Sequence, residues 1–402
     1  MKKKWSILAG LFFCMQAFLA CSESDASSAV INEISEPPTI KVNIPTEEKP
    51  SLRTTILGDS SGKLTSSDLY LDYPADSFLT KFQIGDVVTV AVVGYDTLEM
   101  PVAESANDVP ISWFALKATK GSENLIMTIH YGQMSHILKI NGIKTPIDVV
   151  ITQKDNGGYL LGLETMRYAQ RMSSHEESYP NISVEEFANF REVSTTGMGK
   201  KKLYRSSSPI DHSLGRNFYA DSLAKVADVA TFINLANTED NAKSYGSFDS
   251  SYYSSQNAVF LNLPVEFFSS RFKEGLVRGF RYMIDHNGPY LVHCTYGMDR
   301  TGFTIAVLEA LMGATAEEIQ ADYAKTFSNY FNIIDGRQIG LNELQVDFFK
   351  HVVLRNLRAI YHAEGVDVPN TGNVDWATAT ENYLGKLGMT QQEIFFLKHR
   401  LK

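Results

Sequence analysis

Residues 293–302 have the sequence His-Cys-Thr-Tyr-Gly-Met-Asp-Arg-Thr-Gly, and this stretch decides the fold of the C-terminal half. An apolar run precedes it and a helical pattern of apolar residues follows it. A strand, a tight loop and a helix N-terminus are therefore predicted in that order. The backbone N–H groups of such a loop and the positive end of the helix dipole together form a cradle for an anion.

Two side chains of this loop have the chemistry to act on a bound anion. The field at the helix N-terminus is expected to hold Cys294 as a thiolate. Arg300, with five residues between it and the cysteine, can grip two oxygens of a phosphoryl group through its planar guanidinium. A thiolate aimed at a bound phosphate is a nucleophile for phosphoryl transfer. The nine histidines are scattered and no cysteines are paired, so no metal or cofactor is expected.

The loop resembles the active-site loop of the cysteine-dependent protein tyrosine phosphatase superfamily. Its Asp-Arg-Thr-Gly ending is similar to the bacterial tyrosine and dual-specificity branch. Three further stretches agree with that branch, over roughly residues 180–400: Asn189-Phe190-Arg191-Glu192, Leu203-Tyr204-Arg205-Ser206 and Phe232-Ile233-Asn234-Leu235. The resemblance implies an α/β fold with a sheet flanked by helices, and phosphate-ester hydrolysis through a phosphocysteine on Cys294. It implies that the phosphate is held by Thr295, Tyr296, Gly297, Met298, Asp299 and Arg300.

The general acid, which protonates the leaving oxygen, stays open between several carboxyl groups. The resemblance assigns the role to Asp299, with bracing of Arg300 or helix capping as the alternative. Glu266 lies where dual-specificity relatives carry their acid loop, and it is otherwise an ordinary acid at a helix start. Asp240 and Asp249 belong to the polar stretch 239–256, which is predicted to be a mobile loop beside the site.

Other residues are predicted to support the loop. His293 is expected to orient it or tune the thiolate, and Gly297 to permit a close approach or a positive φ. Thr301 can donate its hydroxyl to the sulfur or make a hydrogen bond at the helix start. Arg205 can pair with an acid or contact the phosphate. Three aromatic residues are candidates for either the pocket wall or the core: Tyr296, Phe267 and Phe268.

Met298 bears on the substrate. Many relatives, including those that act on phosphoinositides, have lysine at this position. Its absence removes a cation from the pocket and counts against a highly charged inositol substrate. The branch that the loop resembles, together with Tyr296, makes protein phosphotyrosine the leading substrate. An inositol phosphate or phosphoinositide phosphatase of the same mechanism is the first alternative, and a non-catalytic phospho-ligand-binding lipoprotein is the second.

The first 21 residues resemble the leader of a bacterial lipoprotein. Three lysines precede an apolar stretch too short for an ordinary membrane span, and the stretch ends at Cys21. A signal peptide over 1–20 and a lipid on Cys21 are predicted, with the chain anchored outside the cytoplasm at the periplasmic or surface face of the outer membrane. Residues 21–52 are rich in Ser, Glu, Pro and Thr and read as a flexible tether. The formal net charge of −9 excludes nucleic acid as an expected partner.

The remaining chain divides into two predicted domains. Residues 53–155 contain runs of β-branched residues separated by glycine turns, which favours a small all-β accessory domain, either a barrel or a sandwich. It weakly resembles the C-terminal β domain of SAM hydroxide adenosyltransferases. Residues 160–402 are predicted to form the phosphatase domain, with strands at 202–204, 230–235, 258–263 and 290–293 and helices at 184–191, 216–227, 271–286, 302–312, 316–326, 342–361, 376–387 and 391–401.

Overall fold

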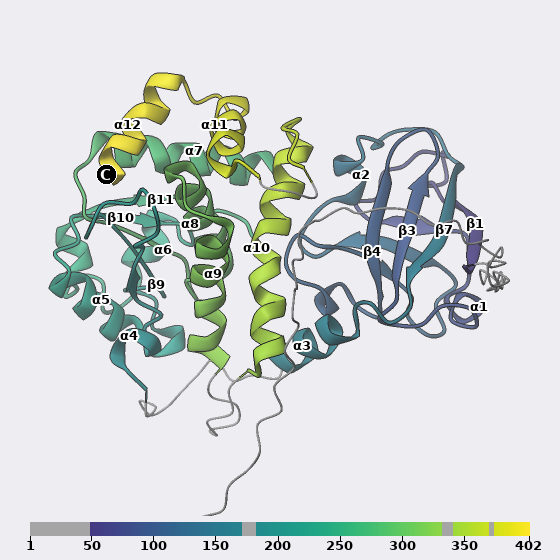
Figure 1. Cartoon of the computed structure of the whole chain (residues 1–402), viewed down its shortest axis with the longest axis horizontal. Helices are drawn as coiled ribbons and strands as arrows, with labels where there is room; N and C mark the ends of the chain where they lie inside the picture. The colour runs from purple at the N-terminus through teal and green to yellow at the C-terminus, as the bar shows by residue number, and fades with distance from the viewer. Residues whose placement is uncertain (1–48, 171–181, 332–340, 370–373) are drawn as a thin grey trace, which may run out of the picture. The chain divides into compact units, whose positions relative to one another are not determined.

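A computed structural model of the chain describes residues 49–170, 182–331, 341–369 and 374–402 (Figure 1). The predicted signal peptide, the lipid site at Cys21 and nearly all of the predicted tether lie outside the described residues. Within the described ranges, no helix is both long and apolar enough to cross a membrane. The combination of an all-β part followed by an α/β part, which the sequence predicted, is confirmed.

Seven strands of the N-terminal part close into a barrel in the order β1-β2-β6-β5-β4-β3-β7. Along β3 (Val87–Val92), every second residue is buried, because successive side chains of a strand point to opposite faces. The other strands are β1 (Ser51–Ile56), β2 (Leu69–Leu71), β4 (Thr97–Ala103), β5 (Phe114–Lys117), β6 (Leu125–Ile129) and β7 (Ile147–Asp155). β1 begins at Ser51, two residues before the start expected for this part. The short helices are α1 (Ala75–Phe78), η1 (Ala106–Asp108) and α2 (Met134–Ile137).

A five-stranded sheet of order β11-β10-β12-β9-β8 forms the centre of the C-terminal part. Four strands are parallel, and only β8 runs antiparallel to its neighbour. Their bounds are β8 (Arg191–Glu192), β9 (Leu203–Ser206), β10 (Thr231–Asn234), β11 (Asn257–Phe260) and β12 (Tyr290–His293). β12 lies between β10 and β9, so the loop that follows His293 leaves the middle of the sheet. Ligands of open α/β sheets bind at this edge, outside the carboxyl ends of the strands.

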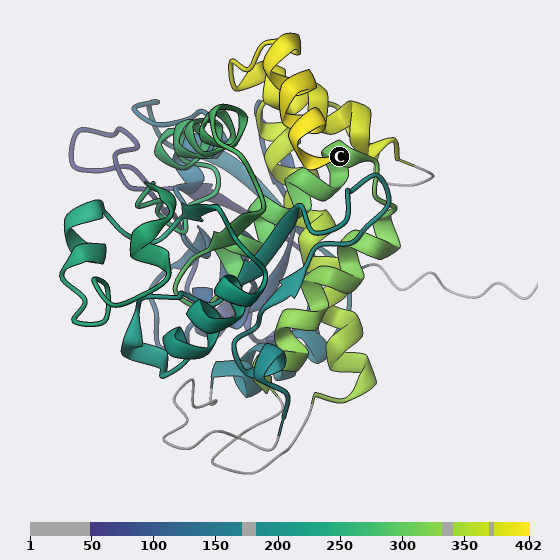
Figure 2. The same cartoon turned by 90° about the vertical axis from the view of Figure 1, so that its left-hand side faces the viewer.

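Both faces of the sheet are covered, as parallel sheets require (Figure 2). Phe232 and Leu291 point to one face, where they share a cluster with Ala220 and Ala224 of α5 (Asn217–Val226). The next residue of each strand, Ile233 or Val292, points to the other face and joins the largest core cluster. α4 (Val184–Phe187), α6 (Glu239–Lys243), η2 (His212–Leu214) and η3 (Tyr253–Ser255) are the other short helical segments.

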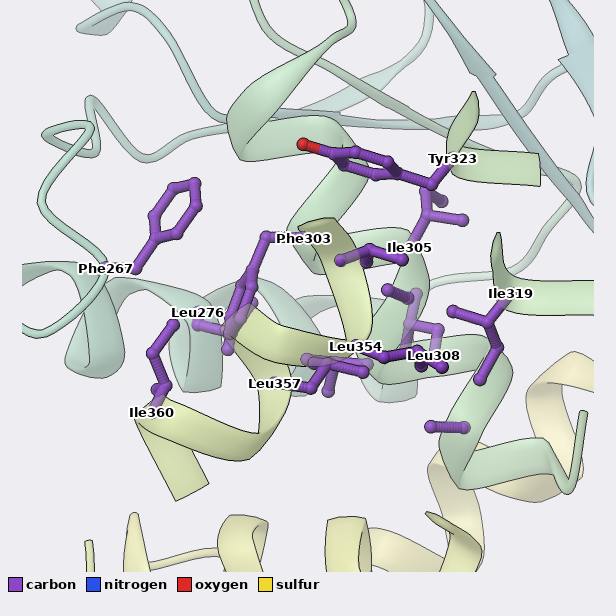
Figure 3. Packing of buried hydrophobic residues seen from close by; sticks show 14 of the residues in the cluster. Phe267, Leu276, Phe303, Ile305, Leu308, Ile319, Tyr323, Leu354, Leu357 and Ile360 are labelled. Carbon is purple, nitrogen blue, oxygen red and sulfur yellow. The ribbon is translucent and has the colours of Figure 1, made fainter. Parts of the chain in front are cut away.

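α8 (Asp299–Met312) is the central helix of this core. Every residue from Thr301 to Met312 is buried, which is typical of a helix packed on all sides. Side chains of α7 (Ser270–Asp285), α9 (Ala316–Phe331) and α10 (Glu343–Ala363) lie around it (Figure 3). α11 (Trp376–Lys386) and α12 (Gln391–Leu401) also contact α8.

Three segments differ from the sequence-based expectation. The helix predicted over 184–191 is wrong in its second half, because α4 ends at Phe187 and Arg191 begins the strand β8. α3 (Leu160–Gln170) is a helix that the apolar pattern did not predict, and it packs against α10 and η1. The stretch 239–256 was predicted to be a mobile loop, which is wrong as a description of its structure. It contains α6 and η3, and Tyr253 is only 1% exposed because it packs on Phe232 of the sheet. The polar composition of this stretch gave no sign that Tyr253 would be buried.

Candidate active site

The loop 294–298 joins the central strand to the central helix. β12 ends at His293 and α8 begins at Asp299, so the strand, loop and helix follow in the predicted order. Cys294 is 3% exposed at the start of the loop. The N-terminus of α8, which carries roughly half a positive charge, faces the same loop. A negative charge on the sulfur or on a bound ligand is therefore stabilised here.

The carbonyl groups of the loop are tied to its surroundings. The backbone N–H of Ser208 donates to the carbonyl of Thr295 at 3.0 Å, and the hydroxyl of Tyr330 donates to that of Tyr296 at 2.6 Å. The amide of Asn189 and the guanidinium of Arg205 donate to the carbonyl of Gly297 at 3.2 and 2.9 Å. In a planar trans peptide, each outward carbonyl leaves the next N–H on the opposite side. The arrangement therefore directs amide N–H groups toward the concave side of the loop, where an anion would bind.

Gly297 has the backbone conformation that the sequence suggested. Its φ of +68° lies in the left-handed region, where a side chain is strained. A Cβ atom at this position would lie 2.1 Å from the carbonyl oxygen of Ser206, at the end of β9. The loop thus lies so close to the sheet that only glycine fits.

A buried ionic cluster stands behind the loop. Arg205 is fully buried and pairs with Asp322 of α9, and Arg191 pairs with the same carboxyl at 2.6 Å. Burial alone would raise the pKa of Asp322, but the two guanidinium groups outweigh it and hold this pKa below its usual range. Of the two roles considered for Arg205, the structure shows pairing with an acid. Arg205 also donates to the carbonyl of Gly297, so the ion pair with Asp322 helps to hold the loop in place.

His293 is fully buried beneath the loop. One ring nitrogen lies 3.4 Å from the hydroxyl of Tyr253, and the other lies 3.4 Å from the carbonyl oxygen of Cys294. Burial lowers the pKa of this imidazole to about 3, so it is neutral at ordinary pH. The geometry suits orientation of the loop, and it gives the ring no proton to transfer near neutral pH.

The four carboxyl groups considered as general acid lie in different places. Asp299 is half-buried at the first position of α8, directly after the loop, and burial raises its pKa to about 6 against the lowering effect of Arg300. Glu266 lines a separate cavity with Lys273 and Glu364, whose lining contains none of the loop residues. Asp240, in α6, and Asp249 are both exposed. Of the four, Asp299 alone adjoins the loop, and its raised pKa suits proton transfer.

Arg300 and Thr301 begin the helix. One guanidinium nitrogen of Arg300 donates to the carbonyl of Leu263 at 3.0 Å, which ties the arginine to the segment after β11. The hydroxyl of Thr301 is buried and has no hydrogen-bond partner within the described residues. A buried hydroxyl without a partner is costly, and this one is available to a neighbouring sulfur or ligand.

The three aromatic candidates separate into different environments. Phe267 is 1% exposed and stacks on Phe303 at 4.8 Å, so it belongs to the core. Phe268 lines the same separate cavity as Glu266. Tyr296 is 37% exposed and lines a cavity together with Met298 and Asp299. Only Tyr296 of the three is placed beside the loop as a wall residue.

Sequence reasoning missed most of the residues that hold the loop from behind. Asp322, Thr326 and Tyr330 stand four residues apart on α9, so they share one helix face that points to Arg205 and the loop. Other positions of α9 are polar as well, so the four-residue spacing of these three residues was the one sequence signal that could have identified them. Asn189 was noted as part of a motif, but its contact with Gly297 needed the structure.

Comparison with known proteins agrees with this geometry. Residues 220–402 match the tyrosine phosphatase family, and this range includes the loop and the whole of α8. A solved structure of an uncharacterized conserved protein from Thermotoga maritima is 21% identical, with a TM-score of 0.21. That match covers 25% of this chain and 35% of the other, so the chain spans about a third of its length. No curated protein matches the chain. Over residues 220–402 the chain is therefore similar to the tyrosine phosphatase family, which supports a hydrolase of the phosphatase type.

Proposed function

We propose that this chain hydrolyses phosphomonoesters, with protein phosphotyrosine as the leading substrate, through a phosphocysteine intermediate. The observation that carries the proposal is the position of Cys294. Its sulfur lies at the junction of the central strand and the N-terminus of α8, in a loop whose carbonyl groups are held outward. A phosphate bound on the concave side would be in reach of the thiolate and of Arg300.

The first half-reaction transfers the phosphoryl group to sulfur. The thiolate of Cys294 attacks phosphorus, an S–P bond forms, and the bond from phosphorus to the leaving oxygen breaks. Asp299 donates its proton to that oxygen, which departs as a neutral alcohol or phenol. Arg300 and the loop amides bind the equatorial oxygens, and they bind most strongly as charge spreads in the transition state.

The second half-reaction returns the enzyme to its starting state. Water attacks phosphorus while the Asp299 carboxylate accepts a proton from it. The S–P bond breaks, inorganic phosphate leaves, and Cys294 is again a thiolate. Donation of the Thr301 hydroxyl to the departing sulfur would ease this step, which is consistent with the unpartnered state of that hydroxyl within the described residues.

The experiment is phosphate release from four substrates: a phosphotyrosine peptide, a phosphoserine peptide, a phosphoinositide and inositol hexakisphosphate. Wild type and Cys294→Ser are compared in the presence of EDTA. We expect release from phosphotyrosine that falls by at least about 10⁴-fold in the variant, because loss of the nucleophile removes the covalent path. Rapid acid quenching with labelled substrate should trap label on the wild-type protein and none on Cys294→Ser.

Each other outcome has a meaning. Release mainly from the inositol substrates would preserve the mechanism and overturn the substrate assignment. Phosphate release that persists in Cys294→Ser would contradict the role of Cys294 as the nucleophile. If reduced wild-type protein binds phosphate but releases none from any substrate, the non-catalytic phospho-ligand-binding alternative replaces the proposal.

We also propose that the chain is exported and anchored by a lipid on Cys21. This proposal rests on the sequence of residues 1–21 alone. Metabolic labelling with a fatty acid should mark the wild type, and Cys21→Ala should abolish the label. Cys14→Ala, which changes another cysteine of the leader, should retain it. Label that persists in Cys21→Ala would contradict the anchor.

A further inference from the structure

A cavity of about 300 Å³ opens directly beside the catalytic loop. Three loop residues contribute to its lining: Tyr296, Met298 and Asp299. The cavity therefore adjoins the loop at these residues. Asp299, the proposed donor of the proton to the leaving oxygen, faces it, so the cavity lies on the side where the leaving group departs.

Aromatic side chains of α9 and α10 form one wall of the cavity. The two helices run side by side (Figure 1), and Phe327 stacks on Phe349 with ring centres 3.8 Å apart and planes 11° apart. Phe331 packs against the same pair, with its ring centre 5.8 Å from that of Phe349. All three phenylalanines are nearly fully buried. The wall is consequently preformed and needs little ordering when a ligand binds.

The barrel part of the chain supplies the opposite wall through Ile111 and His130. The segment that carries Ile111 is fastened to α10. The amide of Asn356 donates to the carbonyl of Ile111 at 3.2 Å, and the guanidinium of Arg355 stacks 3.8 Å from the ring centre of Trp113. Burial lowers the pKa of His130, so its imidazole is neutral near pH 7.

The lining is almost free of charge. Among the residues that line the cavity, Asp299 is the only acid, and neither lysine nor arginine occurs. A polyanionic ligand would find no counter-charge here, whereas apolar surface would be removed from water at a gain of roughly 25 cal/mol per Å². The size is also informative, because a cavity of about 150 Å³ is enough for one benzene ring. A cavity of about 300 Å³ has room for roughly two rings.

We propose that this cavity is a leaving-group subsite, completed by the barrel, which takes an apolar group larger than one phenyl ring. The substrate class is thus an aryl phosphomonoester with an apolar extension. The inference rests on the proposed phosphatase function and adds the chemistry of the organic group. An occupied cavity also excludes water from Asp299 and keeps its carboxyl protonated for donation.

The test compares kcat/KM for phenyl phosphate and 4-biphenylyl phosphate, with glycerol 3-phosphate as a polar reference, using the full chain. For wild type, we expect the biphenyl ester to exceed the phenyl ester by tenfold or more, since a second ring buries additional apolar surface. Ile111→Asp places a charge in the barrel wall and should reduce this ratio about tenfold. The matched control is Ile143→Asp, at an exposed isoleucine of the same barrel that is not in the lining of this cavity, and it should keep the wild-type ratio.

A milder variant protects the test against misfolding. Met166→Ala shortens a half-buried side chain of α3 that lines the cavity, and it should lower the same ratio roughly threefold. If the thermal transition shows that Ile111→Asp is unfolded, the ratio of kcat/KM measured with Met166→Ala decides the test instead. Equal kcat/KM for the two aryl esters, or a ratio unchanged in the folded variants, would overturn the subsite and leave the proposed function intact. Failure of wild type to hydrolyse any of the esters or the phosphotyrosine peptide would instead refute the proposed function.

Discussion

The loop 294–298 has two unlike neighbourhoods. Behind it, toward β9 and α9, stand buried charges and hydrogen bonds: Arg205, Asp322 and Asn189 hold the loop through Gly297. Beside it, toward α10, the barrel and the aromatic residues of α9, stand rings and aliphatic side chains around Met298. Polar contacts fix backbone direction because hydrogen bonds are directional. Apolar contacts instead lower the dielectric around Asp299 and thereby raise its pKa. The groups that position the loop and the groups that set this pKa therefore lie on different sides of the loop.

The largest effect is expected on the apolar side, at Asp299. Asn in its place removes the general acid and should lower kcat for phenyl phosphate by about 10²–10⁴-fold. The loss should be far smaller for 2,4-dinitrophenyl phosphate, whose leaving group departs without a proton. Because the acid must be protonated, wild-type kcat should fall as the pH rises above about 6. The measurement is steady-state kcat as a function of pH for both esters.

The same carboxyl links folding stability to pH. Its folded-state pKa of about 6 lies above the ordinary 3.8, so the folded chain binds the proton more tightly than the unfolded chain. Its favourable contribution is present below pH 3.8 and is lost as the pH rises through 6. Asp299→Asn should remove this slope from the free energy of unfolding. If the fall in kcat above about pH 6 persists unchanged in Asp299→Asn, another group is the general acid.

The next largest effect is expected on the polar side, at Asp322. Asp322→Asn keeps the shape but leaves two buried guanidinium groups without their counter-charge. Breaking a buried pair in this way costs about 3–5 kcal/mol in the free energy of unfolding. Urea denaturation measures it. Glu239→Gln, which breaks an exposed pair with Lys243, serves as the control and should leave the midpoint unchanged. Equal midpoints for the two variants would contradict the role given to the buried cluster.

A third prediction concerns Gly297, where the loop meets the polar side. Gly297→Ala would place a Cβ 2.1 Å from the carbonyl of Ser206, so the loop must shift. Displacement of catalytic groups by about 1 Å costs on the order of 100-fold in rate. Gly313→Ala is a matched control, because that glycine also has a positive φ, of +92°, yet its Cβ would meet nothing within 4 Å. Kinetics of folded Gly297→Ala equal to those of Gly313→Ala would show that the close approach is unimportant.

The smallest effect is expected for Glu266, which belongs to neither neighbourhood. Its carboxyl lines the cavity shared with Lys273 and Glu364, away from the loop residues. Glu266→Gln should therefore change kcat by less than about threefold, compared with the loss expected at Asp299. A loss comparable to that of Asp299→Asn, measured on phenyl phosphate, would reassign the general acid.

Local sequence determined the strand, the loop and the helix that carry Cys294 and Arg300. An apolar run of β type, a glycine, and an apolar helical pattern leave the chain few alternatives over residues 290–312, and these elements appear where they were expected. The α/β class followed from the same alternation of elements. The match to the tyrosine phosphatase family covers this segment.

Tertiary structure decided what surrounds that loop. Asp322 and Tyr330 lie far from it along the chain, and only the packing of α9 against the sheet brings them to Arg205 and Tyr296. Ile111 reaches the cavity because α10 holds the barrel segment through Asn356. Local pattern specifies the period and ends of an element, whereas its contacts depend on which faces can be buried together. The pKa of Asp299 is likewise a property of burial, which no stretch of sequence contains by itself.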